Sequence, residues 1–234
     1  AANGAVTVTL PTSFSSNLTN GKLTNGKSGR DLSGDIKIIY TDQELKGLGE
    51  VNSTDLTIKG STIVEGSVYG GGEESNFSGN TAVKLQENAH VLGSIYGGGK
   101  GKADNFKCDK AMIGIVDTGL ADDGQTTKEG GTTVTIDNGT VDGNVYGGGE
   151  VGRVEQNTSV TIGSESGSSA PVINGDVFGA GKGVATHGYS ALVRGDSEVT
   201  IQSDAKVLGN VYGGGEIASV GRFKVKLKHQ PRVP

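Results

Sequence analysis

The chain has 234 residues, of which 42 are glycine, and it contains one Cys, one Met and no Trp. Hydrophobic residues make up 33% of it, a fraction that is low for a globular domain and suits a narrow core. Glycine does not recur at every third residue, which excludes a collagen triple helix. The lone Cys108 excludes a disulfide framework within the chain. No apolar stretch approaches the length of a membrane span, so we expect no membrane-embedded segment here.

The formal net charge of −5 is unevenly distributed along the chain. Residues 222–234 contain five of the 21 basic residues and no acidic one, which leaves 16 basic residues against 26 acidic ones in the remainder. An acidic body argues against nucleic acid as a partner, because the phosphate backbone would be repelled. We interpret the basic end as an exposed strand or tail rather than a binding arm.

Residues 1–53 follow the later repeats poorly and are predicted to form an N-terminal cap or degenerate first coils. Segments 5–10 and 35–40 resemble strands, and a polar run at 17–27 separates them. Repeat proteins need atypical terminal units, which keep the exposed end of the core from pairing with other chains. A separate small domain is disfavoured because the segment has too few apolar residues to fill a core.

From residue 54 onward one motif, Val-Tyr-Gly-Gly-Gly-Glu, recurs five times with small variations. We call each copy a glycine corner and expect glycine there because it tolerates a positive φ. Recurrence of one motif indicates stacked units rather than a single wound domain. The copies lie at residues 68–73, 95–100, 145–150, 177–182 and 211–216.

Each glycine corner is preceded by two segments that alternate apolar and polar residues, as a strand with one buried face does. In the third copy these are Thr133-Val134-Thr135-Ile136 and the residues Val141, Gly143 and Val145. Such a unit cannot bury its apolar face alone, whereas stacking in register closes a continuous core. We therefore predict an all-β fold, a parallel and right-handed β-helix or β-solenoid over residues 54–222, with 223–234 as the start of a further coil or a C-terminal tail. An antiparallel sandwich or propeller is disfavoured, because it would need tight hairpin turns between all strands.

The coils are of two alternating kinds, distinguished by the charge that ends each corner. These residues are Glu73, Lys100, Glu150, Lys182 and Glu216, so stacking would place each Glu beside a Lys and favour one register. After each Glu the chain returns quickly to the next strand, whereas after each Lys it makes a longer excursion, over 101–131 and 183–196. Loops on one edge of a solenoid are common binding surfaces.

Two sets of residues are candidates for ligand binding. The first is the aromatic column of the corners, which would either form a platform for sugar rings or close the corner against the glycines. The second is His187, Tyr189 and Arg194 in the excursion 183–196. The aromatic column consists of Tyr69, Tyr96, Tyr146, Phe178 and Tyr212.

Other chemistries find weaker support in the residues. The corners lack the Ser/Thr of a phosphate-binding loop and the Asp of a calcium-binding nonapeptide. The column Thr57, Lys84, Thr135, Thr161 and Thr200 is interrupted by Lys84, so we interpret it as an exposed strand face rather than an ice-binding array. Asp122-Asp123-Gly124 would be at most a weak calcium site, so we predict no catalytic residue, no metal and no cofactor. Further acidic and nucleophilic residues of the first excursion are Asp104, Cys108, Asp109 and Asp117.

The repeated Gly-Asn-Val-Tyr-Gly-Gly-Gly-Glu at 143–150 and 209–216 resembles repeats in large secreted or surface-anchored β-solenoid proteins of gut Bacteroidetes-type bacteria. The resemblance covers about residues 54–222. It implies an extracellular or cell-surface location and brings no catalytic residues with it. We predict a non-enzymatic repeat module, an adhesin or structural stalk, with a host or dietary glycan or another surface protein as partner. The alternative is a polysaccharide-active β-helix enzyme, a lyase or glycoside hydrolase.

Overall fold

The computed structural model describes residues 53–103, 110–114, 130–164 and 170–221, together with two short strands near the N-terminus. The chain divides into two units, residues 1–48 and 49–234. In the first unit, β1 (Leu18–Thr19) pairs antiparallel with β2 (Lys22–Leu23). The strands predicted over 5–10 and 35–40 lie outside the described residues, and the role of residues 1–53 as a cap stays a prediction.

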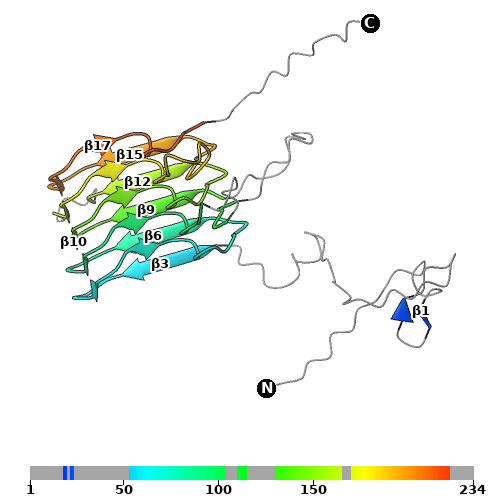
Figure 1. The fold of residues 1–234 in the computed structure, drawn as a ribbon. Helices are drawn as coiled ribbons and strands as arrows, with labels where there is room; N and C mark the ends of the chain where they lie inside the picture. The colour runs from blue at the N-terminus through cyan, green and yellow to red at the C-terminus, as the bar shows by residue number, and fades with distance from the viewer. Residues whose placement is uncertain are drawn as a thin grey trace, which may run out of the picture. The chain divides into compact units, whose positions relative to one another are not determined.

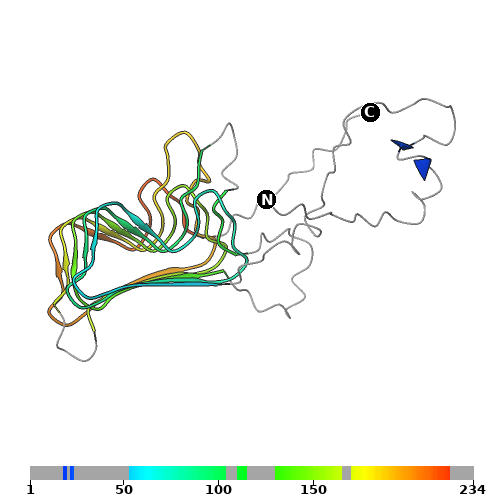
Figure 2. The same cartoon turned by 90° about the horizontal axis from the view of Figure 1, so that it is seen from below.

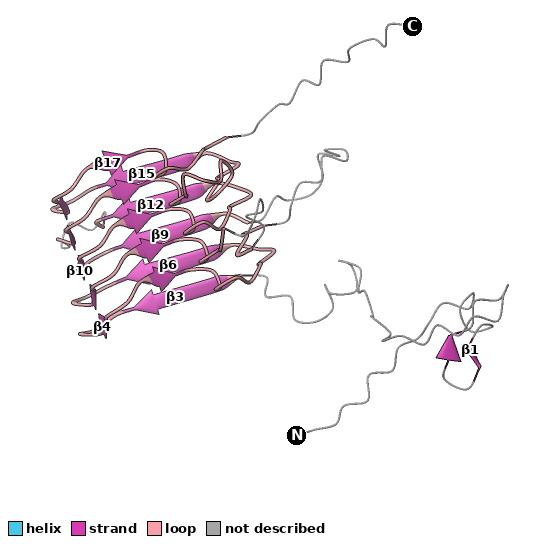
Figure 3. Cartoon of the chain, viewed as in Figure 1, coloured by secondary structure: helices cyan, strands magenta, loops and turns pink. Residues whose placement is uncertain are grey.

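The second unit contains three parallel sheets of five strands each, and its described residues include no helix (Figures 1 and 3). Each circuit of the chain, here called a coil, contributes one strand to each sheet, which confirms the predicted parallel β-solenoid. Sheet 1 holds the long strands β3 (Thr54–Ile58), β6 (Thr81–Leu85), β9 (Thr132–Ile136), β12 (Thr158–Ile162) and β15 (Ser197–Ile201). Sheet 2 holds β4 (Ile63–Val64), β7 (His90–Val91), β10 (Thr140–Val141), β13 (Val172–Ile173) and β16 (Lys206–Val207). Sheet 3 holds β5 (Val68–Tyr69), β8 (Ile95–Tyr96), β11 (Val145–Tyr146), β14 (Val177–Phe178) and β17 (Val211–Tyr212).

The strands of sheet 1 stack equivalent residues directly on one another. Val134 of coil 3 pairs with Val160 of coil 4, which pairs with Val199 of coil 5. In β9 and β12 the first, third and fifth residues are buried and the second and fourth are more exposed. The period-two pattern of the sequence therefore sets which face of the sheet enters the core, and a slip by one residue would turn that core outward.

A fourth column of apolar residues follows the glycine corners and closes the coil on the way back to sheet 1 (Figure 2). Isolated parallel bridges connect its members, and Ile113, Val154 and Val193 are fully buried. Parts of the predicted excursions 101–131 and 183–196 therefore belong to the stack, through Ile113 and Val193. The column consists of Phe77, Ile113, Val154, Val193 and Val220.

The bend between the corner and this fourth column is made by residues other than glycine. Glu74, Val151 and Ile217 lie three residues before the column in coils 1, 3 and 5, Ala111 and Ala191 lie two residues before it in coils 2 and 4, and all five have φ between 51° and 62°. Such a conformation is uncommon for residues with a Cβ, and uncommon for Val and Ile above all. Its recurrence in every coil shows that stacking imposes it against local preference.

The corner glycines, by contrast, are required by close packing rather than by their backbone angles. Those with positive φ among the described residues, such as Gly60 and Gly139, lie outside the corners, so the expectation of positive φ at the corners is wrong. A Cβ on Gly147 would lie 2.1 Å from the carbonyl oxygen of Gly179 in the next coil. The corner backbones of neighbouring coils approach too closely for a side chain to fit between them.

Candidate functional site

The five aromatic residues of the corners form one continuous stack of rings. Centroids of neighbouring rings are 4.6–5.0 Å apart, and the planes deviate from parallel by at most 12°. Tyr96, Tyr146 and Phe178 are buried, Tyr69 is half-buried and Tyr212 is exposed. A ring that is stacked on both faces cannot offer a face to a sugar. Along the column the open ring faces are thus confined to its two ends, and ligand binding by these residues stays a prediction.

Two of the tyrosine hydroxyl groups are also engaged. Tyr69 donates a hydrogen bond to Glu150 Oε2 at 2.5 Å, and Tyr146 donates one to Glu216 Oε2. In both pairs the carboxylate belongs to the corner two coils further along the stack. Burial raises the pKa of both phenols, and the acceptor carboxylates raise it further. The phenols stay protonated at neutral pH, so they act as hydrogen-bond donors that connect alternate coils.

The charged residues that end the corners stack as the sequence predicts. Backbone bridges join Glu73 to Lys100, Glu150 to Lys182 and Lys182 to Glu216. Lys100 Nζ lies 2.9 Å from Glu73 Oε1, and this hydrogen bond raises the pKa of the lysine. The carboxylates of Glu150 and Glu216 instead accept from the tyrosines, so alternation of charge has two uses: pairing with lysine and holding the aromatic stack.

The excursion of coil 4 forms a compact turn rather than an extended loop. A bridge joins Val184 to His187, and the Ser190 hydroxyl donates to the His187 carbonyl oxygen at 2.7 Å. Tyr189 is 59% exposed at this turn. Arg194 lies after the turn, where its Nε is 2.8 Å from Oε2 of Glu155, a carboxylate that is 2% exposed. Arg194 thus neutralises a buried charge of the neighbouring coil. A ligand that binds the guanidinium group would have to compete with Glu155.

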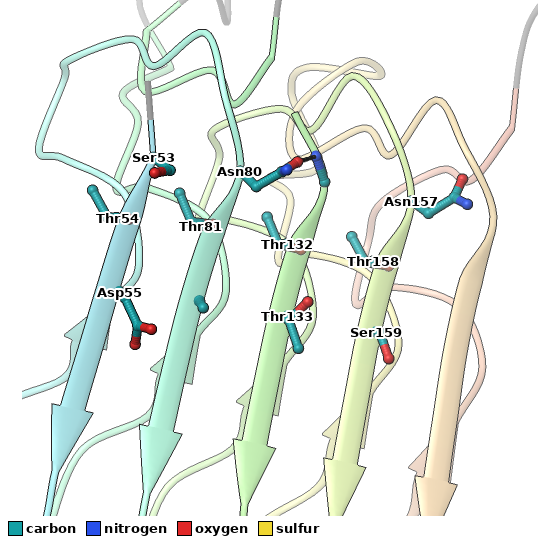
Figure 4. A pocket seen from close by; sticks show the side chains of 12 residues that line it. Ser53, Thr54, Asp55, Asn80, Thr81, Thr132, Thr133, Asn157, Thr158 and Ser159 are labelled. Atoms are coloured by element: carbon teal, nitrogen blue, oxygen red, sulfur yellow. Dashed lines mark hydrogen bonds between the residues drawn. The ribbon is translucent and has the colours of Figure 1, made fainter. Parts of the chain in front are cut away.

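An open depression of about 490 Å³ lies over the first residues of sheet 1, and none of the eight predicted binding residues lines it. Figure 4 shows its polar side chains in rows across strands β3, β6, β9 and β12. The buried hydroxyls of Thr81, Thr132 and Thr158 donate inward to the carbonyl oxygens of glycine corners, at 2.5–2.6 Å. The groups that remain for a ligand are on the outward side: the hydroxyls of Thr133 and Ser159 and the amides of Asn80 and Asn157. The Asp55 carboxylate also faces this side but pairs with Lys84 Nζ at 3.1 Å.

The two asparagines of this depression also hold the strand starts in place. Asn80 Oδ1 accepts from the amides of Gly130 and Gly131, each at 2.9 Å, and Asn157 Oδ1 accepts from Asp196 N at 2.9 Å. With their oxygens used by the backbone, what these side chains can present outward is the NH₂ group. The depression therefore combines amide donors, hydroxyls and one carboxylate, groups that hydrogen-bond polyhydroxylated ligands.

A second polar ladder runs beside sheet 3 and was not predicted. In coils 1 to 4 each side chain in it accepts a hydrogen bond from the backbone N–H of its counterpart in the next coil, at 2.6–3.1 Å. The signal in the sequence is the residue between Gly and Val-Tyr, which carries a side-chain oxygen in every coil. Its members are Ser67, Ser94, Asn144, Asp176 and Asn210.

Most of the predicted excursion chemistry cannot be placed. Asp104, Cys108, Asp109, Asp117 and the Asp122-Asp123-Gly124 segment all lie outside the described residues. Where side chains are described, no group of three or more His, Cys, Asp or Glu could hold a metal ion. The same part of the chain has no helix with the length and hydropathy to cross a membrane.

The sheets, ladders and stacked rings define a parallel β-solenoid repeat protein. Comparison of the chain with protein-family models, with curated proteins and with solved structures finds no match to any of them.

Proposed function

We propose that the chain is a non-enzymatic repeat module that serves as a stalk with an adhesive side, at the extracellular surface that its repeat motif implies. The observation that carries this proposal is the use of the repeated polar residues. Threonine, asparagine, serine and tyrosine side chains recur along the stack, and they bond to the backbone or to a carboxylate two coils away. Residues of this kind build a rod whose length grows by roughly 4.8 Å per coil.

The side of the rod best suited to contact a ligand is the outward start of sheet 1. Thr133 and Ser159 lie opposite each other on neighbouring strands, with Asp55 on β3 of the same depression. The two hydroxyls lie at the spacing of neighbouring strands, and two amides and one carboxylate line the same depression. Such groups can hydrogen-bond an extended glycan, whose own hydroxyls repeat along its chain. We therefore assign glycan contact to this depression in preference to the aromatic column, where neighbouring rings cover the ring faces.

The test is incubation with a panel of host and plant polysaccharides, scoring retention and chain cleavage in the same samples. We expect retention without cleavage, and we expect it to weaken when Thr133→Val and Ser159→Ala remove the outward hydroxyls. Thr135→Val is the matched control, because Thr135 lies on the same strand two residues beyond the depression. Cleavage would establish the alternative, a polysaccharide-active enzyme, and equal retention by all variants would contradict the assignment to the depression.

Deletion of residues 115–129 tests whether the largest excursion is needed for binding. Three residues separate the fourth column from sheet 1 in coils 1, 3 and 4, as between Val154 and Thr158, and coil 2 matches them if residues 115–129 are left out. A Cβ on Gly130 would lie 2.2 Å from Gly114 Cα, so the two ends meet. Joining Gly114 to Gly130 should therefore leave the fold intact. If the joined variant keeps glycan retention, the depression is sufficient for binding; loss of retention would move the site to the excursion.

A further inference from the structure

The last described coil leaves its core open at one end of the stack. β15, β16 and β17 are each the terminal strand of their sheet. Ile201 and Val211 are 40% and 47% exposed, whereas their coil 3 equivalents Ile136 and Val145 are fully buried. An apolar surface bordered by unpaired strand edges is a site for the addition of a further strand.

The backbone of coil 5 is also set for another strand. The first residue of β3, β6, β9 and β12 donates its N–H to a carbonyl oxygen that directly precedes the next strand of sheet 1, at 2.9–3.1 Å. Ser197 occupies this position in β15. Its N–H is therefore directed at the place where the next strand of sheet 1 would begin.

The chain itself leads to this edge. Just after the fourth column, Gly221 N donates to Val193 O of the preceding coil at 2.8 Å. The equivalent residues of the two earlier coils make the same bond, Arg194 N to Val154 O and Glu155 N to Ile113 O. After Arg194 and Glu155, a strand of sheet 1 begins within three residues. Residues 222–234 lie outside the described residues. We propose that residues 223–227 dock on the open edge of β15 as a sixth strand of sheet 1.

The sequence of this segment fixes the register. Phe223, Val225 and Leu227 alternate with lysines, so one register turns the apolar residues inward and the other buries Lys224, Lys226 and Lys228. Burial of three unpaired ammonium groups is prohibitive. The favoured register sets Phe223, Val225 and Leu227 over Ser197, Val199 and Ile201. The connection from Val220 to Phe223 is then one residue shorter than the equivalent connection from Val193 to Ser197. It also places Lys224 beside Glu198, an opposite-charge pair on the outward face.

A second copy of the chain fits the same edge less well. Its first coil would bring Asp55 beside Glu198 and Glu73 beside Glu216, two pairs of like charges in directly stacked positions. Like charges opposite each other oppose pairing, and such contacts are a common means of excluding a wrong partner. The lysine-rich segment of the same chain is the occupant that these charges favour.

Amide hydrogen exchange on the 234-residue chain tests the docking. We expect the Ser197 N–H to be protected, and we expect Val225→Asn to accelerate its exchange by roughly tenfold or more, because an unpaired amide group would enter the core. Lys226→Asn introduces the same side chain one residue later, on the outward face, and should change the rate by less than about twofold. The Thr132 N–H in coil 3 serves as an internal reference that neither substitution should alter.

Three results would overturn the proposal. Exchange of the Ser197 N–H at the rate of an exposed amide would show an uncovered edge. Protection that depends on protein concentration and is unaffected by Val225→Asn would assign the edge to a second copy. A larger effect of Lys226→Asn than of Val225→Asn would show that the register is wrong.

Discussion

At the scale of single residues, the glycine corners show that close approach, rather than backbone angle, can dictate the residue type. We expect Gly147→Ala to destabilise the protein by about 1–3 kcal/mol, because the new Cβ must displace the Gly179 carbonyl oxygen of the neighbouring coil. Gly66→Ala is the control, since a Cβ there would meet nothing within 4 Å. Urea unfolding of both variants measures the difference. Equal midpoints would show that the corners tolerate a side chain.

The buried tyrosine hydroxyls predict how stability depends on alkaline pH. The pKa of Tyr146 is raised above its usual value of about 10 by burial and by Glu216. A phenol whose pKa is higher in the folded state contributes stability in full below pH 10, and this contribution is lost as the pH rises toward the folded pKa. We expect Tyr146→Phe to cost about 1 kcal/mol at pH 7 and to flatten the decline above pH 10. Thermal melting between pH 7 and 11 would show this, and an unchanged alkaline decline would contradict it.

At the scale of the structural elements, the period-two segments of the sequence predict the parallel order and the stacking of the strands, but only two strands per coil. The structure divides the second segment, as between Val64 and Val68, and so has three sheets. The fourth column was missed because each coil contributes one apolar residue to it rather than an alternating segment. A signal does exist, an apolar residue four positions before β6, β12 and β15, as with Val154 before Thr158. In coil 2 the residues 115–129 interrupt that spacing. The depression could not be predicted because its residues come from four strands that only stacking brings together.

Alternating charge at the corners is a property of the stack, and Lys100→Glu tests it. The substitution removes the ion pair with Glu73 and sets three carboxylates in consecutive coils. We expect it to lower the melting temperature more than Lys100→Gln does, by a margin that shrinks as salt screens the repulsion. Melting at low and high ionic strength measures that margin. A margin that does not change with salt would show that the charges do not select the register.

At the scale of the whole molecule, stability should depend on where along the rod a contact is lost. In a solenoid the core of each coil packs against the coils next to it, so an inner coil contributes two interfaces and a terminal coil one. Val145 in coil 3 is fully buried between Ile95 and Val177, whereas Val211 in coil 5 is 47% exposed on sheet 3, which a sixth strand of sheet 1 does not cover. We expect Val145→Ala to cost about 2 kcal/mol or more and Val211→Ala distinctly less, because the cavity in coil 3 is closed on both sides. Denaturant unfolding compares the two variants, and hydrogen exchange shows which coils each substitution affects. Protection should fall on both sides of coil 3 for Val145→Ala but only at the coil 5 end for Val211→Ala. Equal costs would contradict the expectation, because they would show that the position along the stack does not set the cost of a lost contact.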